Sequence, residues 1–193
     1  MTKEKLLSDQ EALSVLKKID SMYSGAKSEL IWDSKFHLLC AVLMSAQTTD
    51  KMVNRVMPKF SQDFPIPSDL ANASIEEIED DIKKIGLYHS KAKHLKASAK
   101  IIAEKYHGHI PKNKKELMSL PGVGEKTANV VLAEGFGVPA IAVDTHVSRI
   151  SKAFKIVPAN ATPHEVEKRL EQLLPKDDWI HTHHAMIHFG RYT

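Results

Sequence analysis

A lysine that follows a glycine turn is the feature of this sequence most suited to chemistry. The stretch from Leu120 to Val131 reads Leu-Pro-Gly-Val-Gly-Glu-Lys-Thr-Ala-Asn-Val-Val. Gly122 and Gly124 let the backbone approach a ligand closely, and a helix is predicted to begin near Gly124. The unpaired N–H groups and the positive dipole end at this helix start would face an anion. The turn therefore predicts a phosphate site.

Lys126 lies within the first turn of the predicted helix. The helix dipole opposes its positive charge and favours the neutral amine, which is the form that a nucleophile requires. A lysine beside a phosphate site is also a common phosphate ligand. From this stretch alone, both roles stay open.

The glycine pattern itself permits three interpretations. It could be a plain turn between two packed helices, because glycine is common at helix ends. A nucleotide P-loop is excluded, because the lysine does not directly follow a glycine, the first glycine is absent and a helix is predicted before the turn. The third interpretation is a hairpin whose amides hold DNA phosphates without reading the base sequence.

Asp144 is the carboxylate that we predict to act with Lys126. It follows the apolar run Ile141 to Val143, which would bring it out of a core, and it can also cap the helix that follows. Buried ion pairs stabilise a fold only weakly, so a buried carboxylate facing a lysine is more often a reaction centre. Lys126 and Asp144 are the predicted catalytic pair.

Four histidines near the C-terminus raise the alternative of a zinc site: His181, His183, His184 and His188. His184 and His188 are one helical turn apart, but no cysteine or second ligand pair lies nearby. We predict no metal site here and interpret the four as polar or DNA-facing surface of the last helix.

The elements that must position these residues are predicted to be helices. Capping-box spacing marks helix starts at Ser8 and Ser74, and Ser90 is predicted to cap a long helix. Helix ends are predicted at Gly86 and Gly190, and a kink or an end at Pro58. The apolar run 136–143 resembles a strand, but it has no second strand to pair with, so it is predicted to be an extended buried connector. The predicted fold class is all-α.

Composition agrees with a packed, soluble protein. The chain has 193 residues, 42% of them hydrophobic, which suffices for one large or two small domains. A net charge of +3 fits a polyanionic partner without requiring one. The single cysteine, Cys40, lies in an apolar run, so we expect a buried thiol and a reducing compartment. No signal region or bilayer-length apolar run is present, and we expect a cytoplasmic protein without membrane association.

With these residues in view, the chain resembles the endonuclease III family of helix-hairpin-helix DNA glycosylases. The resemblance rests on stretches that occur in the family's order: residues 43–50, 85–92, 120–131, 141–147 and 188–193. It implies two helical domains with DNA in the cleft between them. One is a six-helix barrel of residues 27–137, and the other joins residues 1–26 to residues 138–193.

The resemblance also implies an activity and roles for particular residues. The family removes oxidised pyrimidines from duplex DNA and cleaves the resulting abasic sites. By motif, Lys126 would be the nucleophile and Asp144 the catalytic carboxylate, while Gln47 and Leu87 would fill the space left by the extruded nucleotide. The full set of implied DNA contacts is Gln47, Ile85, Leu87, Leu120, Gly122, Val123, Gly124, Thr127 and His146. A monomer associated with the nucleoid of a prokaryote-like cell is expected.

The implied cofactors differ from what this sequence supplies. The family carries a four-cysteine 4Fe-4S cluster directly after Gly-Arg-Tyr-Thr, and this chain stops at Thr193. Cys40 cannot ligate a cluster alone, so we expect a truncated chain or a protein without the cluster, and no cofactor within residues 1–193. A monovalent cation that bridges hairpin carbonyls and phosphate is common in the superfamily and is possible here.

Two alternatives belong to neighbouring classes. An adenine-specific mismatch glycosylase would lack the lysine at position 126 and carry a catalytic glutamate near Gln47, and that stretch contains no glutamate. A non-catalytic DNA-binding module that uses only the hairpin stays open.

Overall fold

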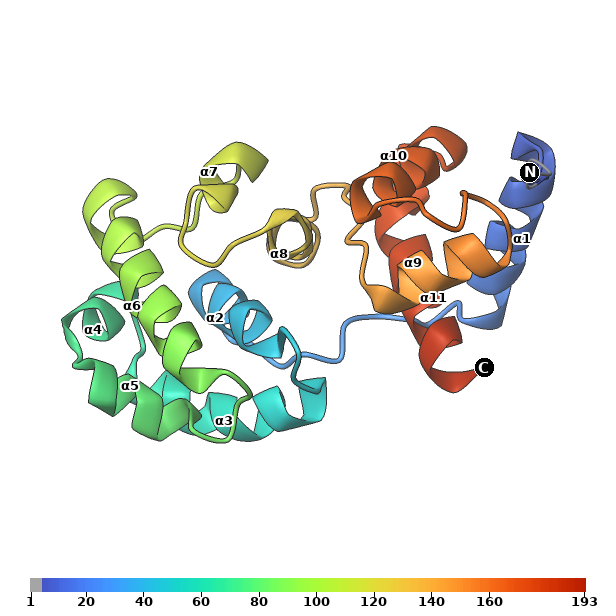
Figure 1. Ribbon diagram of the computed structural model, residues 1–193. Helices are drawn as coiled ribbons and strands as arrows, with labels where there is room; N and C mark the ends of the chain where they lie inside the picture. The colour runs from blue at the N-terminus through green and yellow to red at the C-terminus, as the bar shows by residue number, and fades with distance from the viewer. Residues whose placement is uncertain (1–4) are drawn as a thin grey trace. The chain divides into compact units, whose positions relative to one another are not determined.

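The computed structural model describes residues 5–193 and contains no β-strand within that range. The prediction of an all-α protein is confirmed. Contacts within the chain define two compact units (Figure 1). One is Glu29–Phe136, and the other combines Met1–Ser28 with Gly137–Thr193. Within residues 5–193, no helix is both long and apolar enough to cross a membrane.

The unit Glu29–Phe136 is built around a buried helix. Its elements are α2 (Lys35–Ser45), α3 (Asp50–Asp63), α4 (Pro67–Asn72), α5 (Ile75–Ile82), α6 (Tyr88–Lys105), α7 (Lys114–Met118), α8 (Glu125–Val130) and the π-helix η1 (Val131–Gly135). α2 is buried from Phe36 to Met44, as its continuous apolar sequence predicts, and it packs against α3, α6, α8 and η1. α4 and α5 pack along α6 (Figure 1).

The other unit has its own core. Its helices are α1 (Asp9–Met22), α9 (Thr145–Ala153), α10 (Pro163–Leu173), the 3₁₀ turn η2 (Lys176–Asp178) and α11 (Trp179–Tyr192). Leu16, Ile150, Leu170 and Met186 are among the buried side chains that they share. The segment before α9 is irregular from residue 137, and residues 140–143 are buried, so the predicted buried connector is confirmed over residues 140–143. Its predicted beginning is wrong, because Phe136 still belongs to the preceding helix and Gly137 is exposed.

Several helix starts follow from side-chain caps. The predicted capping boxes at Ser8 and Ser74 are both formed, and Thr162 forms a third at the start of α10. In each box a glutamate carboxylate accepts hydrogen bonds from the capping residue, and this lowers the pKa of Glu11 and Glu77. These local interactions explain why the starts could be predicted from sequence.

Some predicted helix ends are wrong. α3 continues through Pro58 to Asp63, so of the two predicted outcomes, a kink or an end, the end is wrong. The apolar side chain of Phe60 beyond the proline is fully buried. α5 ends at Ile82, before Gly86. α11 continues past Gly190, where an added Cβ would lie 2.8 Å from the Cβ of His146, so this glycine permits close packing and does not end the helix.

The predicted start of α6 at Ser90 is also wrong. The residue before the helix is Leu87, three residues before Ser90, in a left-handed conformation with φ 58°, and the helix begins at Tyr88. Ser90 lies inside the first turn, and its hydroxyl donates to the carbonyl of Leu87 at 3.0 Å. Such a side-chain bond competes with capping and leaves the serine within the helix.

Candidate active site

The glycine turn has the form of a hairpin between two short helices. Asn113 caps α7, its side-chain oxygen accepting from the Glu116 N–H at 3.1 Å. Leu120 and Val123 are buried and anchor the turn, whereas Gly122 and Gly124 are exposed. The arrangement presents backbone at the surface, as a site for a phosphate requires.

Helix α6 packs against this hairpin through Ser98 and His94. The hydroxyl of Ser98 donates to the carbonyl of Pro121 at 2.9 Å. Gly122 has φ 79°, and a Cβ added there would lie 2.8 Å from Nδ1 of His94. The two arms of the hairpin are also joined by an ion pair of 2.8 Å between Lys114 and Glu125. Gly122 is therefore required both by its backbone conformation and by the close approach of α6.

We expect Gly122→Ala to destabilise the fold by about 1–3 kcal/mol, because a side chain there meets both a left-handed backbone and His94. Gly124→Ala is the matched control, because its φ is −92° and no heavy atom lies within 4 Å of an added Cβ. That change should cost less than about 1 kcal/mol, the range of an altered N-cap. Denaturant unfolding measures both, and equal losses would contradict this account of the turn.

Lys126 is the second residue of α8 and is exposed. The predicted position of the lysine in the first helical turn is confirmed. Beside it, Thr127 is half-buried, and Ala128 and Asn129 are buried. The helix then passes directly into η1, and π-helical turns often occur at functional sites. The lysine amine is accessible to a ligand, but whether it serves as nucleophile or phosphate ligand stays a prediction.

Asp144 ends the buried connector and caps α9. Its Oδ1 accepts from the Val147 N–H at 2.8 Å, so the predicted N-cap is confirmed. The side chain is half-buried, and a carboxylate has about four lone-pair positions, so capping does not exhaust its capacity. Lys126 belongs to the unit Glu29–Phe136 and Asp144 to the other unit, and their pairing stays a prediction. His146 is half-buried against Gly190.

Gln47 and Leu87 share an uncommon backbone conformation. Both are exposed, Leu87 by 61%, and both have positive φ, 55° and 58°. Such a conformation costs a non-glycine residue on the order of 1–3 kcal/mol and persists where the surroundings enforce it. The two loops are neighbours, because a Cβ added to Gly86 would lie 3.5 Å from the Gln47 carbonyl oxygen. The structure therefore brings these two predicted DNA contacts together.

Three other predicted DNA contacts are buried: Ile85, Leu120 and Val123. Their side chains belong to the core, so any contact that they make with DNA must come from the backbone. Lys91 is buried as well, and it was not among the predicted site residues. The available signal was its position one turn before Leu95 on the apolar face of α6.

Two of the four C-terminal histidines are also buried. His183 and His184 lie within the fold, so their interpretation as exposed, DNA-facing surface is wrong. His181 and His188 instead join α11 to the segment after α1, each donating from Nε2 to a backbone carbonyl, of Ser24 at 3.0 Å and of Lys27 at 3.2 Å. These histidines hold the C-terminal helix in place.

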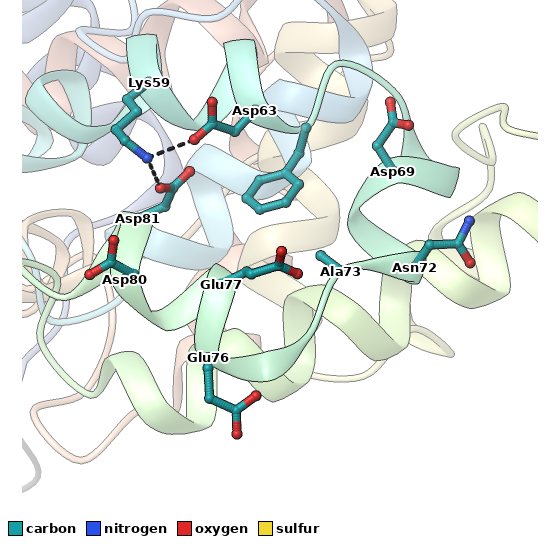
Figure 2. A pocket seen from close by; sticks show the side chains of 10 residues that line it. Lys59, Asp63, Asp69, Asn72, Ala73, Glu76, Glu77, Asp80 and Asp81 are labelled. Carbon is teal, nitrogen blue, oxygen red and sulfur yellow. Dashed lines mark hydrogen bonds and ion pairs between the residues drawn. The ribbon is translucent and has the colours of Figure 1, made fainter.

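A cavity of about 760 Å³ between α3, α4 and α5 is lined mainly by carboxylates (Figure 2). They are Asp63, Asp69, Glu76, Glu77, Asp80 and Asp81. Lys59 pairs with Asp63 at 2.6 Å and also with Asp81, as Figure 2 shows. Burial raises the pKa of Asp81, whereas the hydrogen bond from Lys59 lowers that of Asp63. The lining has six carboxylates and one lysine, so its negative charge repels phosphate, which excludes this cavity from a DNA interface.

The residues of this chain do not fit an iron-sulfur cluster. Cys40 is the single cysteine of the sequence and is buried in α2. Burial raises the pKa of its thiol and disfavours the thiolate that binds iron. Residues 1–193 therefore lack a four-cysteine ligand set.

One known protein family matches a stretch of the chain that includes both the hairpin and much of the fold. The family described as HhH-GPD superfamily base excision DNA repair protein matches residues 40–176, which include the hairpin, Lys126 and Asp144. The chain belongs to this superfamily of base excision DNA repair proteins.

Within the superfamily, the chain is similar to endonuclease III proteins. It is 49% identical over 177 residues to endonuclease III of Bacillus subtilis, covering 92% of this chain and 81% of that protein. The endonuclease III of Escherichia coli strain K12 is 38% identical over 181 residues, with 94% and 85% covered. The predicted resemblance to endonuclease III is confirmed.

Solved structures of endonuclease III are also similar to this chain. A trapped endonuclease III–DNA covalent intermediate superimposes with a TM-score of 0.95 at 44% identity, covering 97% of this chain and 88% of that one. A non-covalent endonuclease III–DNA complex matches equally well, with 97% and 87% covered. A thermostable thymine-DNA glycosylase, at 23% identity and a TM-score of 0.82, shares the fold, with 95% and 88% covered.

Proposed function

We propose that this chain is a base-excision DNA glycosylase and abasic-site lyase that removes oxidised pyrimidines from duplex DNA. The observation that carries the proposal is an exposed lysine at the start of α8, directly after an exposed glycine hairpin. The similarity to endonuclease III supports it, since one similar protein was trapped in a covalent intermediate with DNA.

The hairpin binds the DNA backbone in this proposal. The N–H groups at Gly122 and Gly124 hold a phosphate near the lesion, with the help of Thr127. The hairpin carbonyls would hold a monovalent cation, which would supply further positive charge for that phosphate. The damaged nucleotide leaves the helical stack, and Gln47 and Leu87 occupy the vacated space. His146 contacts the DNA backbone from the other unit.

Lys126 then performs the covalent chemistry. Its neutral amine attacks C1′, the glycosidic C–N bond breaks, and the base leaves with a proton. Opening of the sugar ring gives a Schiff base between Lys126 and C1′. Loss of a C2′ proton and cleavage of the C3′–O bond cut the strand on the 3′ side, and water then releases the lysine. Asp144 stabilises positive charge on the sugar and accepts a proton from the amine.

A substrate panel tests this function. Duplexes that contain thymine glycol, a preformed abasic site, an adenine mismatch or no lesion are incubated with the chain, with and without later alkali. We expect cutting of the first two without alkali and no action on the last two. Binding without cleavage would indicate a DNA-binding module, and adenine release would indicate a mismatch glycosylase.

We expect a monomer on double-stranded DNA in the cytoplasm of a prokaryote, in line with the bacterial origin of its similar relatives.

A further inference from the structure

Lys91 is a charged residue whose ammonium is enclosed within the unit Glu29–Phe136. It is 6% exposed, and its Nζ donates three hydrogen bonds: to the carbonyls of Met44 at 2.9 Å and Ala46 at 2.5 Å, and to Oγ1 of Thr48 at 3.2 Å. An ammonium has three donors, so these acceptors satisfy it completely. Burial lowers the pKa of Lys91, and a charge in such a place requires compensating partners.

The acceptors of Lys91 lie at the end of α2. The last carbonyls of a helix lack partners within the helix and carry the negative end of its dipole, so a lysine there is favourable. Ala46 and Thr48 stand on either side of Gln47 in the sequence. The ammonium is therefore hydrogen-bonded to the residues immediately before and after Gln47, whose φ is positive.

The backbone of Lys91 is tied to the second exposed residue with positive φ. Its N–H donates to the carbonyl of Leu87 at 3.1 Å, within the first turn of α6. One residue thus connects the turn that contains Gln47 to the turn that contains Leu87. Left-handed conformations persist only where the surroundings impose them. The bond to Leu87 is the ordinary backbone bond of a helical turn and forms with any residue at position 91, so the specific contribution of Lys91 is its ammonium on the turn that contains Gln47.

We propose that Lys91 is a positioning residue that holds the backbone around Gln47 and sets its place relative to Leu87, so that both side chains enter the DNA together. The role rests on the proposed function, because it assumes that these two side chains fill the space of the extruded nucleotide. Lys91 itself does not touch the substrate.

The role predicts a difference between two steps of the reaction. Extruding a damaged base requires that it be unstacked and that the vacated space be filled, whereas an abasic nucleotide has no base to unstack. Lys91→Met keeps the apolar stem and removes the charge. We expect it to slow excision of thymine glycol at least about tenfold, while strand cleavage at a preformed abasic site stays within about threefold of wild type.

Lys96 offers a matched control on the same helix. It is half-buried, and its Nζ donates to the carbonyls of Ala71 at 2.7 Å and Ala73 at the end of α4, far in sequence from Gln47. Lys96→Met removes the same kind of interaction, a lysine on helix-terminal carbonyls. We expect a similar fall in melting temperature and no difference between the two substrates.

The experiment compares wild type, Lys91→Met and Lys96→Met. Single-turnover rates are measured on both duplexes, and the fluorescence of 2-aminopurine beside the thymine glycol reports base extrusion. The expected result is a smaller fluorescence change and slower excision for Lys91→Met only. Equal slowing on both duplexes, wild-type rates for Lys91→Met, or the same substrate difference in Lys96→Met would overturn the role.

A milder variant covers the case in which Lys91→Met does not fold. Thr48→Val removes only the hydroxyl acceptor, and we expect a smaller slowing that is again confined to thymine glycol. Uniform rates in that variant would overturn the role. A wild-type chain inactive on both duplexes would instead overturn the proposed function itself.

Discussion

Lys126→Ala should abolish covalent trapping of the chain on DNA by borohydride. Borohydride reduces a Schiff base to a stable amine, so an adduct forms only if a protein amine has bonded to the sugar. Because Lys126 is exposed, the change should alter stability by no more than about 0.5 kcal/mol. Strand cleavage at an abasic site should fall by at least about 10³-fold, the scale on which loss of a nucleophile acts.

Lys126→Arg separates the two roles that the sequence leaves open. Arginine keeps the positive charge that attracts phosphate, but it stays protonated and cannot act as an amine nucleophile. A nucleophilic Lys126 predicts that both variants lose the adduct and that Lys126→Arg still binds DNA. An adduct formed by Lys126→Arg at the wild-type level would assign the chemistry to another amine.

Asp144→Asn should remove turnover while keeping the fold. Asparagine caps a helix as well as aspartate does, so the bond to the Val147 N–H and the start of α9 should persist. The negative charge that would stabilise the sugar is lost, and we expect single-turnover excision to fall by at least about 100-fold. Fluorescence anisotropy with a lesion duplex should show DNA binding within a few fold of wild type.

Asp144→Ala is the companion variant. It removes both the charge and the cap, so it should lose the same activity and in addition about 1 kcal/mol of stability. If Asp144→Asn turns over like the wild type, the carboxylate has no part in the reaction and serves only as a cap.

Local rules predicted much of this fold. The capping boxes at Ser8 and Ser74, the cap at Asp144 and the buried helix α2 depend on residues within a few positions of one another. The family resemblance and the all-α class followed from such stretches and are confirmed. The end predicted at Gly190, and the end that was one of two outcomes predicted at Pro58, are wrong for a different reason, because packing against distant residues decided whether the helix continued.

In the candidate site, too, features set by neighbouring residues could be predicted, and features set by distant residues could not. Its exposed parts, the glycine hairpin and Lys126, could be read from a short stretch. The burial of His184 could not be read in this way, and Ile85, a predicted DNA contact, also lies inside the fold. Lys91 was missed because its partners lie more than 40 residues away at the end of α2, and a lysine among apolar neighbours gives no sign of which carbonyls it meets.

The contacts that helix α6 makes with two loops limit how the sequence of such a protein can change during evolution. Lys91, His94 and Ser98 lie on one side of it at spacings of three and four residues, and they meet the Gln47 turn and the hairpin. At 1.5 Å per residue the first and last are about 10 Å apart along the axis. Side chains on either loop can change independently, but one inserted residue would rotate the two sets of contacts apart by about 100°. New lesion preferences would therefore arise by substitution in the loops, with the length of α6 unchanged.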